Sequence, residues 1–220
     1  MKRRLILCLI AVAMLSACEH TTYDEGDGQY SYMRADFALA HCAAKGELDY
    51  AVTDDGDSLL LSPHATASWT TKEDSVYRAL LYYDIEGAPV VKPFAAVQVP
   101  VLSMRDKADV DTMFTDPVTL ESAWLSRENR YLNLCLQLKT GVKEGIDARQ
   151  IVGIVCDSVA KGEDGSEEWW LRLYHRQNGV PEYYSSKVYV SVPLTVGQGA
   201  KKVHLSVTDY TGEVERVFQY

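Results

Sequence analysis

Residues 131–138 read Tyr-Leu-Asn-Leu-Cys-Leu-Gln-Leu, and this stretch decides the fold class. Leucine occupies every second position from Leu132 to Leu138. Successive side chains of a β-strand point to opposite faces, so this alternation predicts a strand with one face in a core. A helix would instead repeat its apolar residues at spacings of three and four.

The same alternation recurs through the C-terminal half of the chain, and turn residues separate the runs. Glu163-Asp164-Gly165, Asn178-Gly179 and Thr211-Gly212 each predict a hairpin turn, and Asn-Gly is the strongest such signal. Seven short strands at regular spacing favour an antiparallel β-sandwich. We expect these strands at residues 119–125, 131–138, 151–159, 169–176, 184–192, 203–210 and 214–220.

The N-terminal half predicts a smaller β domain. Met33, Ala35, Phe37 and Leu39 share one face of the first strand, and Asp54-Asp55-Gly56-Asp57 is a tight hairpin turn. Five strands in so short a segment fit a small OB-like β-barrel. We expect these strands at residues 32–39, 47–53, 59–61, 76–85 and 97–101, with Leu48, Tyr50 and Val52 on one face of the second.

The expected fold class is therefore all-β, with an OB-like barrel followed by an antiparallel sandwich. Residues 104–117 are polar and end in Asp116-Pro117, which is typical of a linker. We place the barrel domain at residues 30–105 and the sandwich domain at residues 106–220.

The N-terminus has the pattern of a bacterial export signal. Lys2, Arg3 and Arg4 precede an apolar run that is too short to span a bilayer, and Leu15-Ser16-Ala17-Cys18 resembles a lipobox. We therefore predict a signal peptide at residues 1–17 and a lipid anchor on Cys18. Residues 18–29 are polar and acidic, which favours a flexible tether. The alternative is an ordinary secretory signal with a coincidental cysteine.

Charge excludes some classes of partner. The whole chain carries a formal charge of −9, and removal of the three basic residues of the signal makes it −12. Nucleic-acid binding needs clustered Lys and Arg, so we expect no nucleic-acid partner.

Three cysteines remain after Cys8 and Cys18 are set aside, and an odd number argues against a disulfide scaffold. Cys135 and Cys156 could pair in an oxidising compartment. Alternatively, Cys42, Cys135 and Cys156 are small buried hydrophobic residues, which we favour slightly.

No catalytic or metal-binding motif is present. The histidines have no metal-ligand spacing with one another or with cysteine, and no nucleophile elbow or phosphate-binding glycine loop occurs. We therefore expect no cofactor, no metal and no enzymatic activity. A hydrolase with dispersed carboxylates remains an alternative, because sequence cannot bring two carboxylates together in space.

One strand carries a candidate binding face. Trp170, Arg172, Tyr174 and Arg176 share one side of the strand at residues 169–176, and aromatic–arginine surfaces are common in binding sites. The alternative is that this side packs against the N-terminal domain or a loop, because Trp is usually well buried.

The order of these parts resembles the NigD-like lipoprotein family of Bacteroidota. The resemblance covers nearly the whole mature chain, although each motif is a strand pattern rather than a chemical signature. The matching stretches are Leu15–Cys18, Asp74–Tyr77, Leu81–Tyr83, Trp124-Leu125, Tyr131–Leu134, Trp170–His175 before Asn178-Gly179, and Tyr189–Leu194.

The resemblance implies an N-terminal OB-like domain, a C-terminal β-sandwich and a place in the cell envelope. It supplies no catalytic residues. We expect an outer-membrane lipoprotein that faces the periplasm or the cell surface and binds a protein or glycan partner without catalysis. The alternative, suggested by association with the family's namesake, is an immunity factor against an antibacterial toxin.

Overall fold

The structure, a computed structural model, describes residues 28, 30–127, 130–145, 147–194 and 200–219. Residues 1–27, which hold the predicted signal peptide and Cys18, lie outside the described part. Regular structure in the described residues is almost entirely β, with a single short 3-10 helix, η1 (Lys107–Asp109). Within that part, no helix has the length and apolar character needed to cross a membrane.

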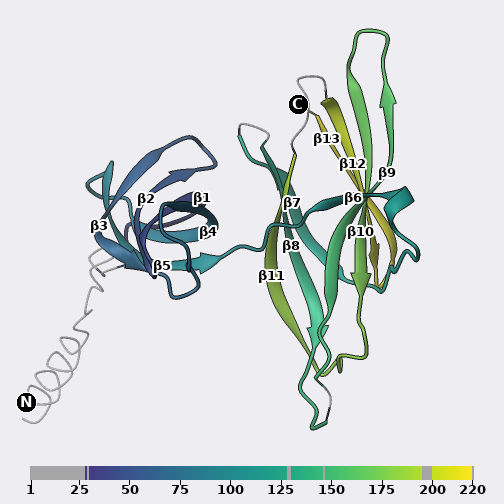
Figure 1. The fold of residues 1–220 in the computed structure, drawn as a ribbon, viewed down its shortest axis with the longest axis horizontal. Helices are drawn as coiled ribbons and strands as arrows, with labels where there is room; N and C mark the ends of the chain where they lie inside the picture. The colour runs from purple at the N-terminus through teal and green to yellow at the C-terminus, as the bar shows by residue number, and fades with distance from the viewer. Residues whose placement is uncertain (1–27, 29, 128–129, 146, 195–199, 220) are drawn as a thin grey trace, which may run out of the picture. The chain divides into compact units, whose positions relative to one another are not determined.

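Five strands form a closed barrel in the order β1-β2-β3-β5-β4 (Figure 1). Neighbours pair antiparallel except β3 and β5, which run parallel at Leu60 and Val90. The predicted turn at Asp54–Asp57 joins β2 to β3 as an antiparallel hairpin, with Gly56 at a φ of 90°. The bounds are β1 (Met33–Ala44), β2 (Glu47–Thr53), β3 (Ser58–Thr66), β4 (Ser75–Asp84) and β5 (Val90–Gln98).

The barrel interior uses a different face of β1 from the one that the larger side chains mark. Ala38, Ala40 and Cys42 are fully buried in the barrel core, whereas Phe37 belongs to a separate apolar cluster with Leu80 and Val99. Small residues fit the tight interior of a five-stranded barrel. The larger Phe37 side chain therefore points out of the barrel.

The predicted face of β2 is wrong beyond Leu48. Leu48 is buried, but Tyr50 is 38% exposed, and Ala51 is buried in its place. In the β1–β2 ladder the register shifts between Leu48 and Tyr50 and leaves Asp49 as an extra residue, and the β2–β3 ladder also shifts register at this point. A bulge of one residue inverts the alternation of every side chain that follows it.

The C-terminal half is a β-sandwich, as the sequence predicts (Figure 1). One sheet has the order β13-β12-β10-β9-β6 and the other has the order β11-β8-β7. Leu132, Leu134, Leu136 and Leu138 all lie in its core. The bounds are β6 (Met104–Asp106), β7 (Thr119–Leu125), β8 (Tyr131–Thr140), β9 (Ile151–Lys161), β10 (Glu167–Arg176), β11 (Tyr184–Pro193), β12 (Ala200–Asp209) and β13 (Gly212–Gln219).

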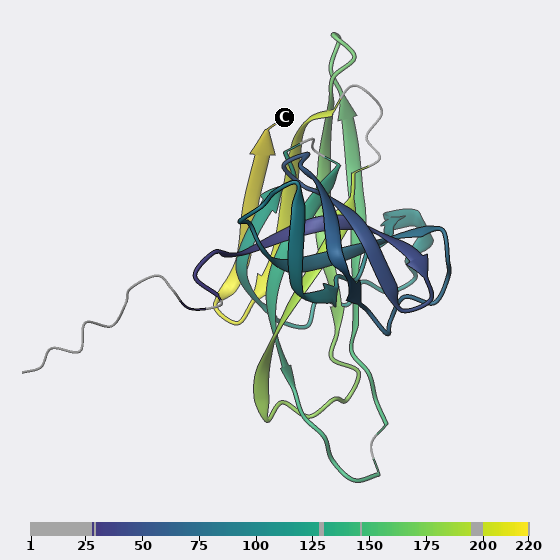
Figure 2. The ribbon, with the colours of Figure 1, turned by 90° about the vertical axis from the view of Figure 1, so that its left-hand side faces the viewer.

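Two details of the sandwich differ from the prediction. The sheets are not purely antiparallel, because β10 pairs in parallel with β12 and β6 pairs in parallel with β9. Asn178 and Gly179 do adopt positive φ values of 53° and 75°, but β10 and β11 belong to different sheets. The turn therefore connects the two layers rather than closing a hairpin. The hairpins at Gly165 and Gly212 do form, and the β9–β10 hairpin extends beyond its neighbours (Figure 2).

The fifth barrel strand and the expected linker also differ. β5 is Val90–Gln98 rather than residues 97–101. Within residues 104–117, Met104–Asp106 form β6 of the sandwich, and Thr115 makes a bridge to His175. A polar segment can still pair through its backbone at a sheet edge, which hydrophobic periodicity does not report.

Candidate functional site

The barrel meets the outer face of the three-stranded sheet along a contact that we call the seam. Both bodies lie in one unit of the chain, Arg34–Tyr220. Asn133 of β8 and Ser191 of β11 are buried polar residues between core-facing leucines and valines, so they point away from the sandwich core. They face the barrel, where Arg78 of β4 reaches them.

A polar cluster that we call the junction network consists of the buried Arg78, Asn133 and Ser191 and the partly exposed Asp54. The two terminal nitrogens of Arg78 each donate to one carboxylate oxygen of Asp54 at 2.6 Å. Arg78 also donates to Ser191 Oγ at 3.1 Å and to Asn133 Oδ1 at 3.0 Å. Asn133 Nδ2 donates to Asp54 at 2.9 Å, and Ser191 Oγ donates to Asn133 Oδ1 at 2.7 Å. The barrel and the sandwich are therefore joined by hydrogen bonds as well as by apolar contact.

The junction network is fully partnered. The Arg78 side chain is 1% exposed, and its guanidinium lies 4.3 Å from the centre of the Tyr131 ring and 5.3 Å from that of Phe37. No buried side-chain nitrogen or oxygen in the described residues lacks a hydrogen-bond partner. The planar fork of arginine suits a carboxylate that it grips with two parallel bonds. These bonds offset the cost of burying the charge.

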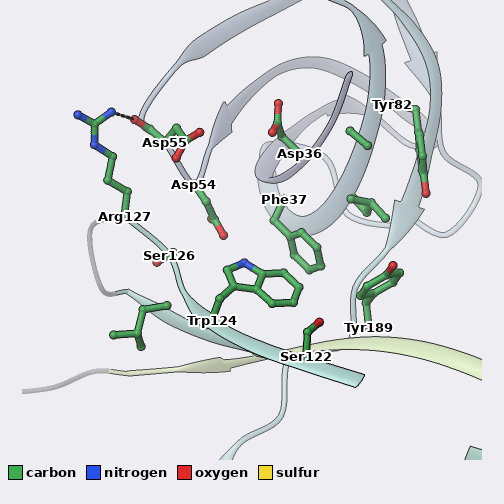
Figure 3. Close-up of a pocket in the computed structure, with 13 residues that line it drawn as sticks. Asp36, Phe37, Asp54, Asp55, Tyr82, Ser122, Trp124, Ser126, Arg127 and Tyr189 are labelled. Atoms are coloured by element: carbon green, nitrogen blue, oxygen red, sulfur yellow. Dashed lines mark hydrogen bonds between the residues drawn. The ribbon is translucent and has the colours of Figure 1, made fainter. Parts of the chain in front are cut away.

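A crevice opens along the seam beside the junction network, with a volume of about 410 Å³ (Figure 3). Strands β1 and β4 and the β2–β3 turn line it from the barrel, and β7 and β11 line it from the sandwich. Its volume lies in the range of about 300–1,000 Å³ that is usual for ligand sites. The lining residues are Ala35, Asp36, Phe37, Asp54, Asp55, Leu80, Tyr82, Ser122, Trp124, Leu125, Ser126, Arg127 and Tyr189.

Aromatic rings form the floor of the crevice. Trp124 and Tyr189 of the sandwich each pack edge-on against Phe37 of the barrel, with ring centres 5.2 and 5.6 Å apart. Phe37 is buried, whereas Trp124 and Tyr189 are partly exposed to the crevice. Edge-on aromatic pairs stabilise their arrangement beyond simple burial. The rings therefore form a fixed apolar surface that water can reach.

Charged groups form the rim, and they are paired. Arg34 Nε lies 2.7 Å from Asp36 Oδ2 and its Nη2 lies 3.1 Å from Asp55 Oδ2. The Tyr83 hydroxyl donates to the same Asp36 oxygen at 2.6 Å, and burial together with this bond raises the pKa of Tyr83. Arg127 donates to the backbone oxygen of Asp55 at 3.3 Å. The rim thus has both signs of charge close together.

The binding face predicted on β10 is largely occupied by its own domain. The Trp170 ring stacks on His204 at 4.9 Å, and Arg172 donates to Asp157 at 2.8 Å. Tyr174 is buried, packs edge-on against Phe114 and lies under the Arg105 guanidinium, while Arg176 covers Phe114 at 4.5 Å. The four residues do line one side of β10, but Arg105 and Phe114 cover the end that holds Tyr174 and Arg176.

The cysteines and histidines do not assemble a reactive centre in the described residues. Cys42, Cys135 and Cys156 are free and buried, so Cys135 and Cys156 are not paired. No group of three or more His, Cys, Asp or Glu side chains in the described ranges is placed to hold a metal ion. His41 bridges Asp49 and Asp74, and His204 bridges Glu168 and Glu215. His20 lies outside the described residues.

The crevice has no contiguous signature in the sequence. Phe37, Trp124 and Tyr189 lie far apart in the sequence, and each reads as one more apolar position on a strand. The sequence does contain one signal of a covered face. Asn133 and Ser191 alternate with leucines and valines, at positions where a strand exposed to solvent would carry charged residues. Short polar residues on an outer face indicate that another part of the chain covers them.

Comparison with known proteins agrees with this architecture. The family model of the NigD-like C-terminal beta sandwich domain matches residues 100–220. No curated protein matches the chain in sequence.

Several solved structures share the fold. A NigD-like immunity protein from Bacteroides caccae is 23% identical, with a TM-score of 0.61, over 83% of this chain and 91% of the other. A protein from Parabacteroides distasonis, named as toxin-related, is 18% identical, with a TM-score of 0.65, over 86% and 93%. A Bacteroides fragilis protein named as a lipoprotein is 12% identical, with a TM-score of 0.57, over 85% and 96%. At these identities the likeness is one of fold.

Proposed function

The chain belongs to the NigD-like family, and we propose that it is a non-catalytic binding protein of the cell envelope that holds its ligand in the crevice. The crevice is the observation that supports this proposal. A buried ionic network fixes the two walls in place, and partly exposed aromatic rings form the floor between them. Ligand sites commonly combine such an apolar surface with a few polar groups.

Binding without catalysis fits the state of the carboxylates. Asp54 is held in two bonds by Arg78, and Asp36 lies in contact with Arg34 and the Tyr83 hydroxyl. Both carboxylate oxygens of Asp54 and one oxygen of Asp36 are thus engaged in bonds within the protein. We therefore do not assign a hydrolytic role to Asp36, Asp54 and Asp55.

The envelope part of the proposal rests on the sequence. The basic start, short apolar run and Leu15–Cys18 motif fit a lipid anchor on Cys18, and the fold is shared with a protein named as a lipoprotein. The anchor is tested by growing cells with a labelled fatty acid. We expect label on the wild-type protein and none on Cys18→Ser, and membrane association should be lost together with the label.

The binding part is tested with separated envelope components. Outer-membrane proteins, surface polysaccharide and peptidoglycan are each passed over the immobilised mature protein, and retention is compared with that on Trp124→Ala. Tyr50→Ala is the matched control, because Tyr50 is a partly exposed aromatic of the barrel that stacks on His41 outside the crevice. We expect one component to be retained by the wild type and the control but not by Trp124→Ala. Equal retention by all three proteins would contradict the proposal.

An immunity role is the second candidate. Proteins of the same fold are named as an immunity protein and as toxin-related, and a mature charge of −12 would attract a basic toxin. In this case the crevice would bind part of the toxin. Deletion of the gene should then make cells sensitive to a toxin encoded beside it, and the wild-type gene, but not the Cys18→Ser form, should restore protection.

A further inference from the structure

We propose that the crevice recognises a neutral saccharide, with one sugar ring lying against Trp124. This inference names the ligand class of the site and so depends on the proposed function. It rests on three properties of the crevice: an accessible aromatic face, polar groups of mixed donor and acceptor character beside it, and the balance of charge around it.

The aromatic face comes from Trp124, with Tyr82 and Tyr189 nearby (Figure 3). All three side chains are partly exposed, although each packs on the apolar cluster around the buried Phe37. A sugar ring has an apolar face of C–H groups, and burial of that face against an indole is favourable. A crevice of about 410 Å³ has room for the end of a short oligosaccharide but not for a folded domain.

Polar groups with unused bonding capacity surround this face. The Trp124 indole nitrogen, a hydrogen-bond donor, lies on the side of the crevice that holds Asp54 (Figure 3). The contacts of Asp36 use Oδ2 and leave Oδ1 as an acceptor. The exposed Ser122 hydroxyl and the Arg127 guanidinium complete the set. Donors and acceptors at several angles suit the hydroxyl groups of a sugar.

The charge balance argues against an ionic ligand. Three carboxylates line the crevice, those of Asp36, Asp54 and Asp55. Three guanidinium groups, those of Arg34, Arg78 and Arg127, contact these aspartates. These six groups therefore carry equal numbers of positive and negative charges, so no excess of one sign among them favours a cationic side chain or an anionic headgroup. A neutral ligand with many hydroxyl groups fits this arrangement best.

The test is isothermal titration of the mature protein with defined oligosaccharides. The neutral probes are cello-, malto-, xylo- and manno-oligosaccharides, the charged probes are oligogalacturonate and chitosan oligomers, and a lysine-rich peptide represents a protein ligand. We expect binding of a neutral oligosaccharide that changes by less than about twofold between low and high salt, because screening acts on charged ligands. The charged probes and the peptide should not bind.

Three variants locate the binding. Trp124→Ala should weaken it by about tenfold or more, and Trp124→Phe should weaken it less, because one aromatic ring remains although the N–H donor and part of the stacking area are lost. Ser122→Trp places a bulky side chain on an exposed position of the crevice wall and should abolish binding without disturbing the core. Trp170 lies on β10, stacks on His204 and does not line the crevice, so Trp170→Phe should bind as the wild type does.

Two outcomes overturn the inference. The first is binding of the peptide or a charged oligomer in the crevice, lost in Ser122→Trp; the crevice would then still be a binding site, and the proposed function would stand. The second is that no neutral oligosaccharide binds, or that one binds equally to Ser122→Trp. If envelope components are still retained in a Trp124-dependent manner, only the saccharide class is wrong. If that retention is also absent, the proposed function fails as well.

Discussion

The junction network and the crevice lie side by side along one seam, and they use polar groups in opposite ways. In the junction network, Arg78 donates to Asp54, Asn133 and Ser191, and its side chain is only 1% exposed. In the crevice, Asp36, Ser122 and Trp124 line a space that a ligand can enter. Asp54 belongs to both regions, because it lines the crevice while it pairs with Arg78.

This difference indicates that the two regions of the seam have separate roles. A polar group that is buried and fully bonded stabilises an arrangement, whereas a polar group that is accessible and unbonded can recognise another molecule. The network would hold the barrel at a fixed distance from the three-stranded sheet. The crevice exists because the two surfaces are held together beside it without closing over it.

The largest expected effect is that of breaking the network. Arg78→Met removes the cation and leaves Asp54, Asn133 and Ser191 short of buried partners, so we expect the free energy of unfolding to fall by about 3–5 kcal/mol. Denaturant unfolding followed by circular dichroism measures it. Arg172→Met is the matched control, since Arg172 also pairs with an aspartate but its side chain is 38% exposed. It should lose at most about 1 kcal/mol. Equal losses of unfolding free energy in the two variants would mean that burial does not increase the contribution of Arg78 to stability.

The next effect sharpens the comparison by measuring coupling across the seam. Asn133→Leu removes the sandwich partner of Arg78, so Arg78→Met and Asn133→Leu together should cost less than the sum of the single changes. We expect a coupling of about 0.5–3 kcal/mol in a double-mutant cycle of unfolding free energies. The pair Arg78→Met and Trp170→Phe, which share no partner, should add within about 0.5 kcal/mol. An additive Arg78–Asn133 pair would show that the hydrogen bonds do not join the two bodies.

A smaller effect concerns pH and lies outside the seam. A hydrogen bond to Asp49 raises the pKa of His41 in the barrel, and a bond to Glu168 raises the pKa of His204 in the sandwich. A raised folded pKa means that the stabilisation is complete below the unfolded pKa of about 6.5 and is lost as pH rises through the folded value. The urea midpoint should therefore fall as pH rises above about 6.5. His41→Gln and His204→Gln should each flatten that slope.

At acidic pH the dependence of stability on pH comes from carboxylates. The bond from His41 lowers the pKa of Asp49 although burial opposes it, and bonds from Lys202 and His204 lower the pKa of Glu168. Their contribution is present above the unfolded values of about 4 and is lost as pH falls through the folded ones. The ligand affinity of the crevice should not change with the titration of these histidines or of these carboxylates. A crevice affinity that tracks the histidine titration would show that the bodies and the seam are coupled.

Much of the fold follows from the sequence because alternation and turn chemistry are local. The leucines of β8 predict its core face, and Gly56, Gly165 and Gly212 mark three real hairpins. The failures are of two kinds. A bulge at Asp49 inverts a face without a sequence signal, and the turn at Asn178-Gly179 has the predicted backbone but joins strands of different sheets. Sheet membership is decided by distant packing, which a turn does not encode.

The crevice could not be predicted, for a related reason. Its residues come from β1, β4, β7, β11 and the β2–β3 turn, and only the docking of two domains brings them together. On the sequence alone, Trp170 on β10 was the more conspicuous aromatic, yet it stacks on His204 within its own sheet. The sequence predicts that Phe37 is a core residue. It is buried, but in the apolar cluster with Leu80 and Val99 rather than in the barrel core. The apolar character of a residue predicts that it is buried, but it does not identify the residues that bury it.

The smallest expected effect uses two cysteines to compare the seam with the sandwich core. Cys135 lies two residues from Asn133 on the same face of β8, whereas Cys156 lies in the sandwich core. Burial raises the pKa of both thiols, and the carboxylate of Glu121 raises that of Cys135 further. A thiol reagent should therefore modify neither in the folded protein, as followed by mass spectrometry of each cysteine peptide. In Arg78→Met at neutral pH, modification of Cys135 should become faster while that of Cys156 stays slow, because local opening of the seam exposes Cys135 but not Cys156. If both rates rise together, loss of the network loosens the whole domain, and the seam does not open as a separate unit.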